Sequence, residues 1–480
     1  MRPSLLKAYH LLPPSARDLV ASWQGRRLFH LRYGLETDNL ACAAREREAW
    51  GATQWRSWQE EHLSSLLRCT AESVPHYQAV WAESQAKHGH RSALRLQNWP
   101  LLSKQELREQ PRTFLAKNAA SKRLQVEHTS GTTGTPLKLW QSRDTTRLWY
   151  ALAEVRWRNW YGISRADRWG IFGGQLVVPI GQKKPPFWVW NTGLNQLYLS
   201  SYHLSAQTCA SYLQALHKRR IVYLYGYASS LHSLALFIQE QRLDPPPFKI
   251  ILSNAEPLYA HQRDLISRVF ACPVRDTYGT SEKVCAASEC EAGKMHLWPD
   301  VGVYEVLRDD ADEPVKCGQT GRLVCTGLLG SDMPLIRYDV GDRVAIAPPE
   351  ERCACGRTLP ILLSVEGRSD DVILTADGRR IGRLDPVFKQ DMPIREAQVI
   401  QETLDHLRVL VVPGSGFSPK HEQALVSALR ERVGDVAVVI ERVTEIPRSA
   451  NGKFRAVISK VSGNATAANR QSKHDQLAGT

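Results

Sequence analysis

The sequence predicts a mixed α/β protein, with a large N-terminal domain of stacked α/β layers and a small, mobile α+β domain at the C-terminus. The chain has 480 residues, which is enough for more than one domain. Across residues 121–345, short β-like runs alternate with helical patterns, as is typical of stacked α/β units. The clearest β-like runs begin at Trp169, Ile221 and Lys249, and the clearest helix spans Leu231 to Ile238.

The flanking segments complete the predicted domain organisation. Trp55, Leu66 and Leu67 belong to an apolar stripe at helical spacing, so we expect residues 1–120 to be mainly helical. Towards the C-terminus, a helical pattern from about His421 to Val433 lies between two strand-like runs. The predicted units are a large adenylation domain over residues 1–367, a small lid domain over 368–460 and a disordered tail of small polar residues over 461–480.

The net charge of the chain indicates which kinds of ligand it favours. Lys and Arg number 62 against 49 Asp and Glu, a net charge of +13, which favours anionic ligands such as nucleotide or CoA phosphates. No basic-aromatic patch or nucleic-acid motif is present, so we expect no nucleic-acid partner. No apolar run suits a signal peptide or a transmembrane segment. The ten cysteines lack the spacing of small secreted domains, and we expect a cytoplasmic protein.

A loop rich in glycine and hydroxyl groups is the strongest local feature. Residues 129–135 read Thr-Ser-Gly-Thr-Thr-Gly-Thr. Glycines let the backbone approach a ligand closely, and successive N–H groups in such a turn form an anion site. The loop lacks the Gly-Lys-Ser/Thr ending of the common P-loop. Its residues suit the oxygens of a polyphosphate, although most clusters of this composition are ordinary turns.

Four later motifs give this loop a context. They are Tyr278-Gly-Thr-Ser-Glu282, Arg337-Tyr-Asp-Val-Gly-Asp342, Gly367-Arg-Ser-Asp-Asp371 and Pro447-Arg-Ser-Ala-Asn-Gly-Lys453. Their order and spacing resemble the adenylate-forming superfamily of acyl-CoA ligases, peptide-synthetase adenylation domains and luciferases. Ser253-Asn-Ala-Glu-Pro-Leu258 and Cys353-x-Cys-Gly-Arg357 are similar to the phenylacetate–CoA ligase branch. Leu12-Pro-Pro14 and the stretch from Gly25 to Gly34 resemble CapK-type members, which are linked to polysaccharide biosynthesis. The resemblance extends to about residue 460.

The resemblance implies ATP-dependent activation of a carboxylic acid as acyl-adenylate, with release of pyrophosphate and transfer of the acyl group to CoA. Catalysis of this reaction depends mainly on positioning and on neutralising phosphate charge. By resemblance, the loop residues Thr129, Ser130, Gly131, Thr132, Thr133 and Gly134 hold the β- and γ-phosphates. Tyr278 stacks on adenine within a motif completed by Gly279, Thr280 and Ser281, and Glu282 binds Mg²⁺. Asp342 accepts hydrogen bonds from the ribose hydroxyls, and Arg368 reaches the ribose or phosphates.

The remaining implied roles concern the small domain and the acid. Lys453 corresponds to the lysine that bridges the carboxylate and the phosphate, and a flexible ammonium suits that role. Asp370 corresponds to the hinge about which the small domain rotates between the two half-reactions. We expect the acyl pocket near Tyr225, Gly226 and Tyr227. One departure is that Leu137 stands where many members carry a lysine after the proline of the loop.

Cys290-x5-His296 and Cys353-x-Cys355 form a second constellation. Thiolates and imidazole suit tetrahedral zinc, but this spacing is not that of a standard zinc finger. The alternative is a set of small buried cysteines with a hydrogen-bonded histidine. The combination resembles a metal cluster in some phenylacetate–CoA ligase relatives, which implies a structural Zn²⁺.

Three questions stay open at this point. Transfer of the activated acid to an amine or a sugar in polysaccharide assembly is the alternative to CoA. A basic binding or scaffold protein that retains the fold is the non-enzymatic alternative, although Glu282, Asp342 and Lys453 are all present. A homodimer is compatible with the sequence, and the acid itself is not identified.

Overall fold

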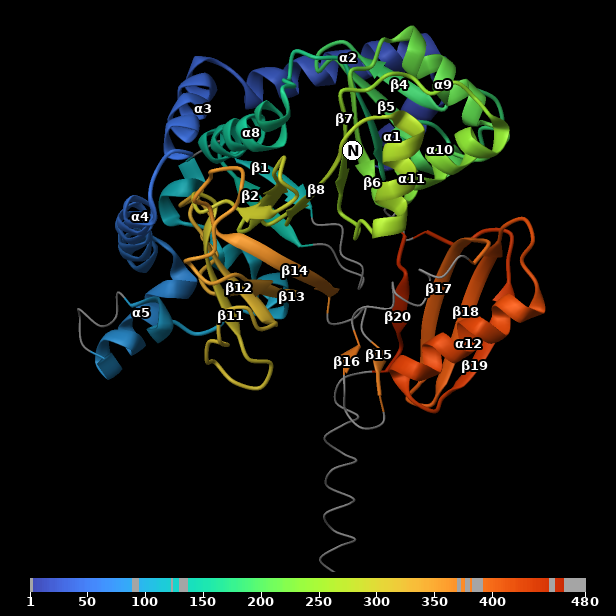
Figure 1. Cartoon of the computed structure of the whole chain (residues 1–480). Coiled ribbons are helices and arrows are strands. Elements are labelled where there is room, and N and C mark those ends of the chain that lie inside the picture. Colours follow the sequence, from blue (N-terminus) through green and yellow to red (C-terminus); the bar gives the residue numbers. More distant parts are fainter. Residues whose placement is uncertain are drawn as a thin grey trace, which may run out of the picture. The chain divides into compact units, whose positions relative to one another are not determined.

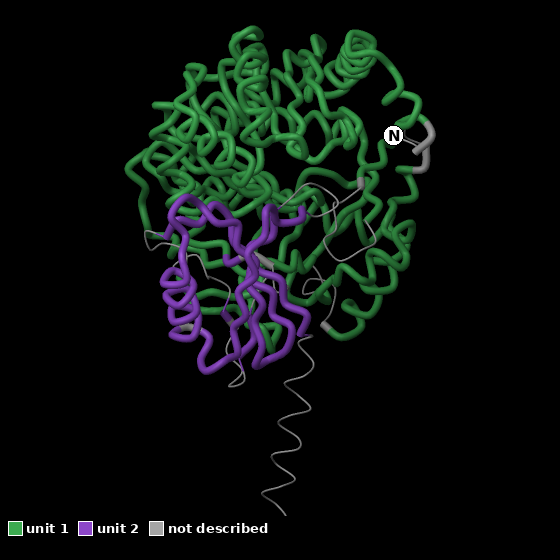
Figure 2. Tube along the Cα trace, turned by 90° about the vertical axis from the view of Figure 1, so that its right-hand side faces the viewer, with its two compact units in different colours: residues 1–365 green, residues 366–480 purple. Residues whose placement is uncertain are grey.

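The computed structural model describes residues 3–88, 95–121, 124–128, 137–368, 373–375, 380–381, 392–448 and 454–461. The chain divides into two compact units, residues 1–365 and 366–480 (Figure 2). The predicted domain boundary between residues 367 and 368 lies close to this division. The predicted α/β class, with a large sheet-rich unit and a smaller one that also contains strands, is confirmed.

The described residues up to Ser121 are mainly helical. Their α-helices are α1 (Pro3–His10), α2 (Pro14–Arg32), α3 (Leu35–Arg47), α4 (Ala52–Ser73), α5 (Pro75–His88) and α7 (Lys104–Glu109). Short 3-10 turns follow at η1 (Leu96–Asn98), η2 (Pro111–Phe114) and η3 (Lys117–Ser121). Local chemistry sets several boundaries. Pro14 occupies the first turn of α2, where a missing N–H costs nothing. Ser103 caps α7 in a reciprocal capping box with Glu106.

A 12-stranded sheet forms the body of the large unit, in the order β11-β12-β13-β14-β10-β9-β8-β7-β6-β3-β5-β4. One half contains β3 (Trp169–Gly173), β4 (Trp188–Asn191), β5 (Gln196–Ser200), β6 (Tyr223–Tyr227), β7 (Ile250–Asn254) and β8 (Val274–Gly279). The other half contains β9 (Ala286–Glu289), β10 (Met295–Leu297), β11 (Gly302–Leu307), β12 (Gly321–Gly327), β13 (Tyr338–Ile346) and β14 (Ile361–Arg368). Strands β5, β3, β6, β7 and β8 run parallel, whereas β9 pairs antiparallel with β8.

Helices cover both faces of the parallel strands (Figure 1). On one face lie α9 (Cys209–Lys218), α10 (Ala228–Gln241) and α11 (Ala260–Phe270), packed in one core with Leu224 of β6. The next residue, Tyr225, faces the other way, because side chains alternate along a strand. Its ring contacts Trp157 at the end of α8 (Arg143–Trp157), so α8 lies on the opposite face. Short turns η4 (Asn159–Tyr161) and η5 (Ser201–His203) complete this half.

A separate hairpin carries the glycine-rich loop. Strand β1 (Gln125–His128) pairs antiparallel with β2 (Lys138–Gln141), in a register that sets Glu127 opposite Leu139. Residues 129–136 connect these strands and lie outside the described residues. Leu137, where many superfamily members have lysine, is 1% exposed and belongs to the core of the large unit. Its side chain therefore serves packing.

The small unit has a four-stranded sheet in the order β19-β18-β17-β20. Its strands are β17 (Ile394–Thr403), β18 (His406–Pro413), β19 (Ala437–Arg442) and β20 (Val457–Ser459), with a short pair β15 (Ile373–Leu374) and β16 (Arg380–Ile381). Helix α12 (Pro419–Val433) buries Leu425, Ala428 and Leu429 against this sheet. It ends before Gly434, whose φ of +98° favours glycine. Within the described residues, no helix combines the length and hydropathy needed to cross a membrane.

Candidate active site

The turn between β8 and β9 carries the predicted metal ligand. Strand β8 runs parallel to β7 and then reverses into β9, with Gly279 opposite Ala286. The N–H of Lys283 donates to the Thr280 carbonyl at 3.0 Å and closes the turn. The Glu282 side chain is only 8% exposed. Its Oε1 accepts a hydrogen bond from the Tyr338 hydroxyl at 3.0 Å and lies 3.7 Å from the Lys104 ammonium.

Tyr278 and Asp342, predicted to contact adenine and ribose, touch each other. The Tyr278 hydroxyl donates to Asp342 Oδ2 at 2.6 Å. The sheet order separates β8 from β13 by β9, β10 and β14, so the sheet must curl to allow this contact. Burial, together with the neighbouring carboxylate, raises the pKa of the Tyr278 hydroxyl well above its usual value. The hydroxyl therefore stays protonated and holds the Asp342 carboxylate in place.

A pocket with a mixed polar and apolar lining adjoins Glu282. Its lining includes Glu282, Lys283, Gln141, Thr145 and Asp332, from the β8–β9 turn, β2, the first turn of α8 and the segment after β12. The carboxylate of Asp332 accepts hydrogen bonds from the Ser142 N–H at 3.3 Å and the Thr145 hydroxyl at 3.2 Å. Oxygen ligands of this kind suit Mg²⁺. Sequence reasoning missed Lys283, Thr145 and Asp332, because none lies within a motif that it used.

Lys283 is the least expected residue in the lining of this pocket. It directly follows Glu282 and adopts a left-handed φ of +56°. Its side chain is only 9% exposed, and its Nζ lies 3.0 Å from Glu127 Oε1 in β1. The same ammonium donates to Gln141 Oε1 in β2. Its position directly after the motif was the only signal in the sequence.

The predicted acyl-pocket residues lie at the carboxyl end of β6. Tyr227 is the register partner of Asn254 at the end of β7, so Tyr225, Gly226 and Tyr227 lie beside the 253–258 motif. Ligands of open α/β sheets bind at this edge. Gly226 is required there, because a Cβ atom would lie 2.9 Å from the Cβ of Phe172. The N–H of Ser229 in α10 donates to Glu256 Oε2 at 2.9 Å and ties the two motifs together.

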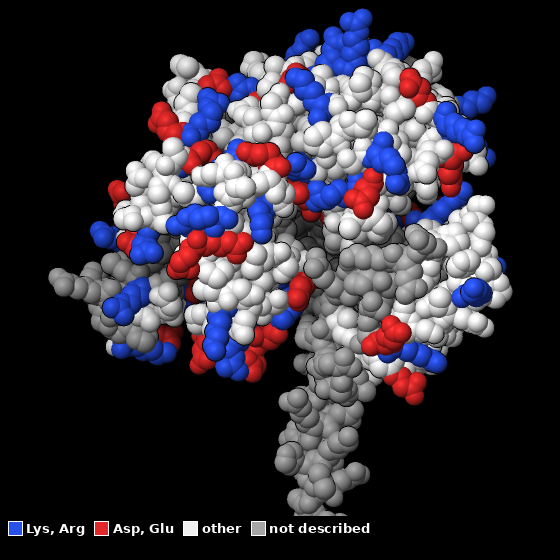
Figure 3. All heavy atoms as spheres, in the orientation of Figure 1, with Lys and Arg blue, Asp and Glu red and all other residues white. Residues whose placement is uncertain are grey.

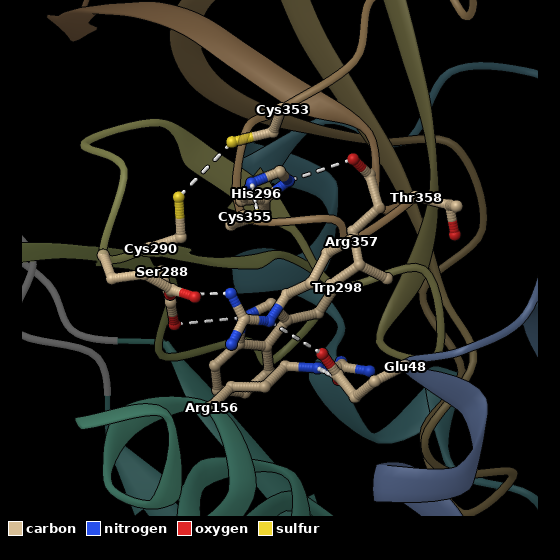
Figure 4. A network of polar contacts seen from close by, with 12 residues as sticks. Glu48, Arg156, Ser288, Cys290, His296, Trp298, Cys353, Cys355, Arg357 and Thr358 are labelled. Carbon is tan, nitrogen blue, oxygen red and sulfur yellow. Dashed lines mark hydrogen bonds and ion pairs between the residues drawn. The ribbon is translucent and has the colours of Figure 1, made fainter. Parts of the chain in front are cut away.

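The Cys and His constellation assembles as a compact cluster. Ligand atoms of Cys290, His296, Cys353 and Cys355 all lie within 4.8 Å of one another. The two thiols of Cys290 and Cys353 are 3.6 Å apart, and Cys355 Sγ is 3.4 Å from His296 Nε2 (Figure 4). The cluster joins the β9–β10 hairpin to the connection between β13 and β14.

The chemistry and spacing of this cluster fit zinc. With Zn–S bonds near 2.3 Å and Zn–N bonds near 2.1 Å, a tetrahedral ion holds its ligand atoms roughly 3.5–3.8 Å apart. The two closest pairs are near that separation. His296 Nδ1 lies 3.0 Å from the Leu359 carbonyl. With Nδ1 donating to this oxygen, Nε2 is left as the ligand atom, which is a common arrangement at zinc sites.

An ionic network lies beside the cluster. Arg357 lies 3.4 Å from Glu48 (Figure 4). It also lies 2.7 Å from Glu291, and its guanidinium lies over the Trp160 ring. Glu48 also pairs with Arg156, which is fully buried and bound to Asp300. Burial alone would raise the pKa of Asp300, but the charge and hydrogen bond of Arg156 and the charge of Arg47 together outweigh it and hold the pKa below its usual value. These pairs fix the packing around the cluster.

Several predicted residues cannot be placed. The loop residues Thr129, Ser130, Gly131, Thr132, Thr133 and Gly134, the hinge Asp370 and the lysine Lys453 lie outside the described residues. Arg368 ends strand β14, but its side chain is also outside the described residues.

On the face shown in Figure 3, the basic and acidic side chains are interspersed.

Comparisons with known proteins find relatives in the family that the motifs resemble. The domain family described as CapK C-terminal domain matches residues 373–460. Protein CapK of Staphylococcus aureus is 27% identical over 63% of this chain and 67% of its own length. Phenylacetate-coenzyme A ligase of Thermus thermophilus is 25% identical over 86% of this chain and 98% of its own length.

A solved structure shares the fold. It is that of a 2-hydroxyisobutyryl-CoA ligase in the postadenylation state, in complex with R3-HIB-AMP, with a TM-score of 0.66 at 20% identity. The match covers 90% of this chain and 94% of the other. The sequence relatives, the C-terminal domain and the fold all agree with the motifs in the sequence. Residues 373–460 match the CapK C-terminal domain, and the chain as a whole is similar in sequence and fold to the phenylacetate–CoA ligases and CapK-like proteins of the adenylate-forming superfamily.

Proposed function

We propose that this protein is an AMP-forming ligase that activates a carboxylic acid with ATP as acyl-adenylate, releases pyrophosphate and transfers the acyl group to CoA. The observation that carries this proposal is the contact of Tyr278 with Asp342. Tyr278 belongs to the same motif as Glu282, which lies in the turn between β8 and β9. These residues supply an aromatic face, a ribose acceptor and a metal ligand. That combination suits a nucleoside triphosphate.

The chain's own residues position the nucleotide and balance its charge. Asp342, held by Tyr278, accepts hydrogen bonds from the ribose, while the Tyr278 ring packs against adenine. Glu282 and the other oxygen-bearing side chains of the adjoining pocket would hold Mg²⁺, and the bound ion would neutralise charge on the phosphates. Glu282 is held in turn by Tyr338, so its carboxylate is oriented before the nucleotide binds. Such preorganisation reduces the reorganisation needed as charge develops.

Lys453 is the proposed catalytic cation, on the basis of its motif. Its ammonium would contact both the attacking carboxylate and the α-phosphate, and so reduce the repulsion between two anions. In this proposal Asp370 is the hinge, Arg368 contacts the ribose or phosphates, and Thr129 to Gly134 hold the β- and γ-phosphates. The proposal assigns the two half-reactions to two orientations of the small unit.

A second acceptor is proposed from the resemblance to CapK-type members, which are linked to polysaccharide biosynthesis. In that alternative, the adenylated acid is transferred to an amine or a sugar in polysaccharide assembly. The acid itself would bind near Tyr225, Gly226 and Tyr227, at the carboxyl end of β6. Tyr225 contacts the rings of Trp157 and Trp169, and this aromatic surrounding favours an apolar or aryl acid.

Zinc is the proposed occupant of the Cys290, His296, Cys353 and Cys355 cluster. The ligand spacing, the Cys₃His chemistry and the Leu359 hydrogen bond support this assignment. The cluster lies in the antiparallel half of the sheet, and Tyr278, Asp342 and Glu282 are not among its ligands. Its role is therefore structural, as a cross-link between the β9–β10 hairpin and the chain before β14.

The test of the proposed function is ATP–pyrophosphate exchange against a panel of carboxylic acids. An acid that supports exchange identifies the substrate class. A second assay, with CoA, amines or sugars added, then identifies the acceptor. If no acid supports exchange while ATP still binds, the proposed activation is wrong.

A further inference from the structure

Lys283 links the metal-ligand turn to both strands that carry the glycine-rich loop. Its Nζ lies 3.0 Å from Glu127 Oε1 in β1 and donates to Gln141 Oε1 in β2. Glu127 is two residues before the loop begins, and β2 leads out of it. One buried side chain thus joins three segments of the proposed phosphate site.

The ammonium of Lys283 has little freedom to leave this position. It is only 9% exposed, and a buried charge separated from its partners is costly. It also lies 5.9 Å from the centroid of the Trp149 ring in α8, within reach of a cation–π contact. The left-handed φ of +56° is unfavourable for a residue with a Cβ atom. The surrounding contacts must therefore hold this backbone conformation.

The same conformation directs successive side chains to different partners. Glu282 contacts Tyr338 and Lys104, whereas Lys283 contacts β1 and β2. The side chains of Glu282 and Lys283 both line the pocket that adjoins Glu282. A shift of Lys283 would therefore move Glu282 relative to strands β1 and β2.

We propose that Lys283 is a positioning residue that fixes Glu282 relative to strands β1 and β2 for metal–nucleotide binding. This inference rests on the proposed function, since it assigns the β- and γ-phosphates and their metal to this pocket. It also predicts that loss of Lys283 weakens the binding of metal–ATP but not the binding of AMP. ATP carries the β- and γ-phosphates that the metal at Glu282 would bind, whereas AMP lacks them.

The test compares Lys283→Met with Lys283→Arg and with a matched control, Lys294→Met. Lys294 lies in the β9–β10 turn, with a side chain 49% exposed and an ion pair to Glu351. Binding of Mn²⁺–ATP is followed by electron paramagnetic resonance, and AMP binding by calorimetry. Outer-shell positioning residues typically change metal affinity about 10–100-fold, so K283M should weaken Mn²⁺–ATP binding at least about tenfold and leave AMP binding nearly unchanged. K283R should restore part of the affinity, and K294M should match the unmodified protein.

Several results would overturn this role. One is a folded K283M protein that binds Mn²⁺–ATP as the unmodified protein does. Another is an equal loss of Mn²⁺–ATP and AMP binding, which would indicate only a structural role. If K283M does not fold, E127Q decides, because Glu127 is 39% exposed and tolerates the change more easily. Unchanged Mn²⁺–ATP affinity in E127Q would then refute the proposal.

The unmodified protein separates this inference from the proposed function. If it binds Mn²⁺–ATP but no acid supports pyrophosphate exchange, the proposed function fails and Lys283 is judged on binding alone. If it binds no Mn²⁺–ATP, both proposals fail. If it binds and exchanges, and only K283M loses Mn²⁺–ATP, both are supported.

Discussion

Removing one ligand of the Cys290, His296, Cys353 and Cys355 cluster should release zinc and lower the thermal stability. The appropriate change is Cys353→Ser, which keeps the size of the side chain but replaces a strong zinc ligand with a weak one. Cys290 and Cys353 are 63 residues apart, and a cross-link over a loop of that length contributes about 4 kcal/mol in the chain-entropy model.

Part of that stabilisation survives without the metal. Strands β10 and β14 pair directly, with His296 opposite Ile361, and so keep the same segments together. We therefore expect a loss of roughly half, about 2 kcal/mol, and a fall in Tm of roughly 3 °C for a unit of residues 1–365. Affinity for AMP should be almost unchanged, because no cluster ligand belongs to the proposed nucleotide site.

The assay combines metal analysis of the purified protein with thermal unfolding. Unmodified protein should carry about one zinc per chain. The matched control is Cys317→Ser, because Cys317 is exposed and outside the cluster. The reasoning is refuted if unmodified protein contains no zinc, or if C353S keeps both its zinc and its Tm. A C317S protein with the same losses would show that the effect is not specific to the cluster.

Three further changes test separate parts of the site. Lys453→Ala should lower kcat and kcat/KM for adenylation together, because the proposed contact forms only in the transition state; unchanged exchange would remove Lys453 from the mechanism. Asp342→Asn should weaken ATP and AMP binding alike, about tenfold, because a carboxylate accepts ribose hydrogen bonds more strongly than an amide; equal affinities would contradict the ribose role. Burial, partly offset by a Ser253 hydrogen bond, raises the pKa of Asp276 to about 7 from 3.8, so its contribution to the free energy of unfolding falls as pH rises through that window. Asp276→Asn should therefore gain Tm relative to unmodified protein between pH 5 and pH 8, and a difference that is constant with pH would refute this.

Local patterns predicted the elements well. The runs at Trp169, Ile221 and Lys249 lie at β3, β6 and β7, and the helix predicted from His421 is α12. Alternation and helical spacing are properties of neighbouring residues, so one sequence is enough to detect them. The pairing of twelve strands into one sheet depends on contacts between distant segments, and no local pattern specifies it.

The residues of the candidate site also fall into two groups, those that the sequence predicted and those that only the fold identified. Motif resemblance singled out Tyr278, Asp342 and Glu282, and the structure brings Tyr278 and Asp342 together across 64 positions. Lys283 and Asp332 were missed, because a single lysine or aspartate has no distinctive pattern until the fold buries it. The cysteine cluster was predicted only in part. Its residue types indicated zinc, but only the fold shows that the four ligand atoms converge.

The central claim is that the site cleaves ATP between its α- and β-phosphates to activate an acid. The most direct measurement is product analysis by chromatography after incubation with ATP, Mg²⁺ and an acid that supports exchange. The account predicts AMP and pyrophosphate, with acyl-adenylate accumulating when no acceptor is present. The appearance of ADP and orthophosphate would contradict it.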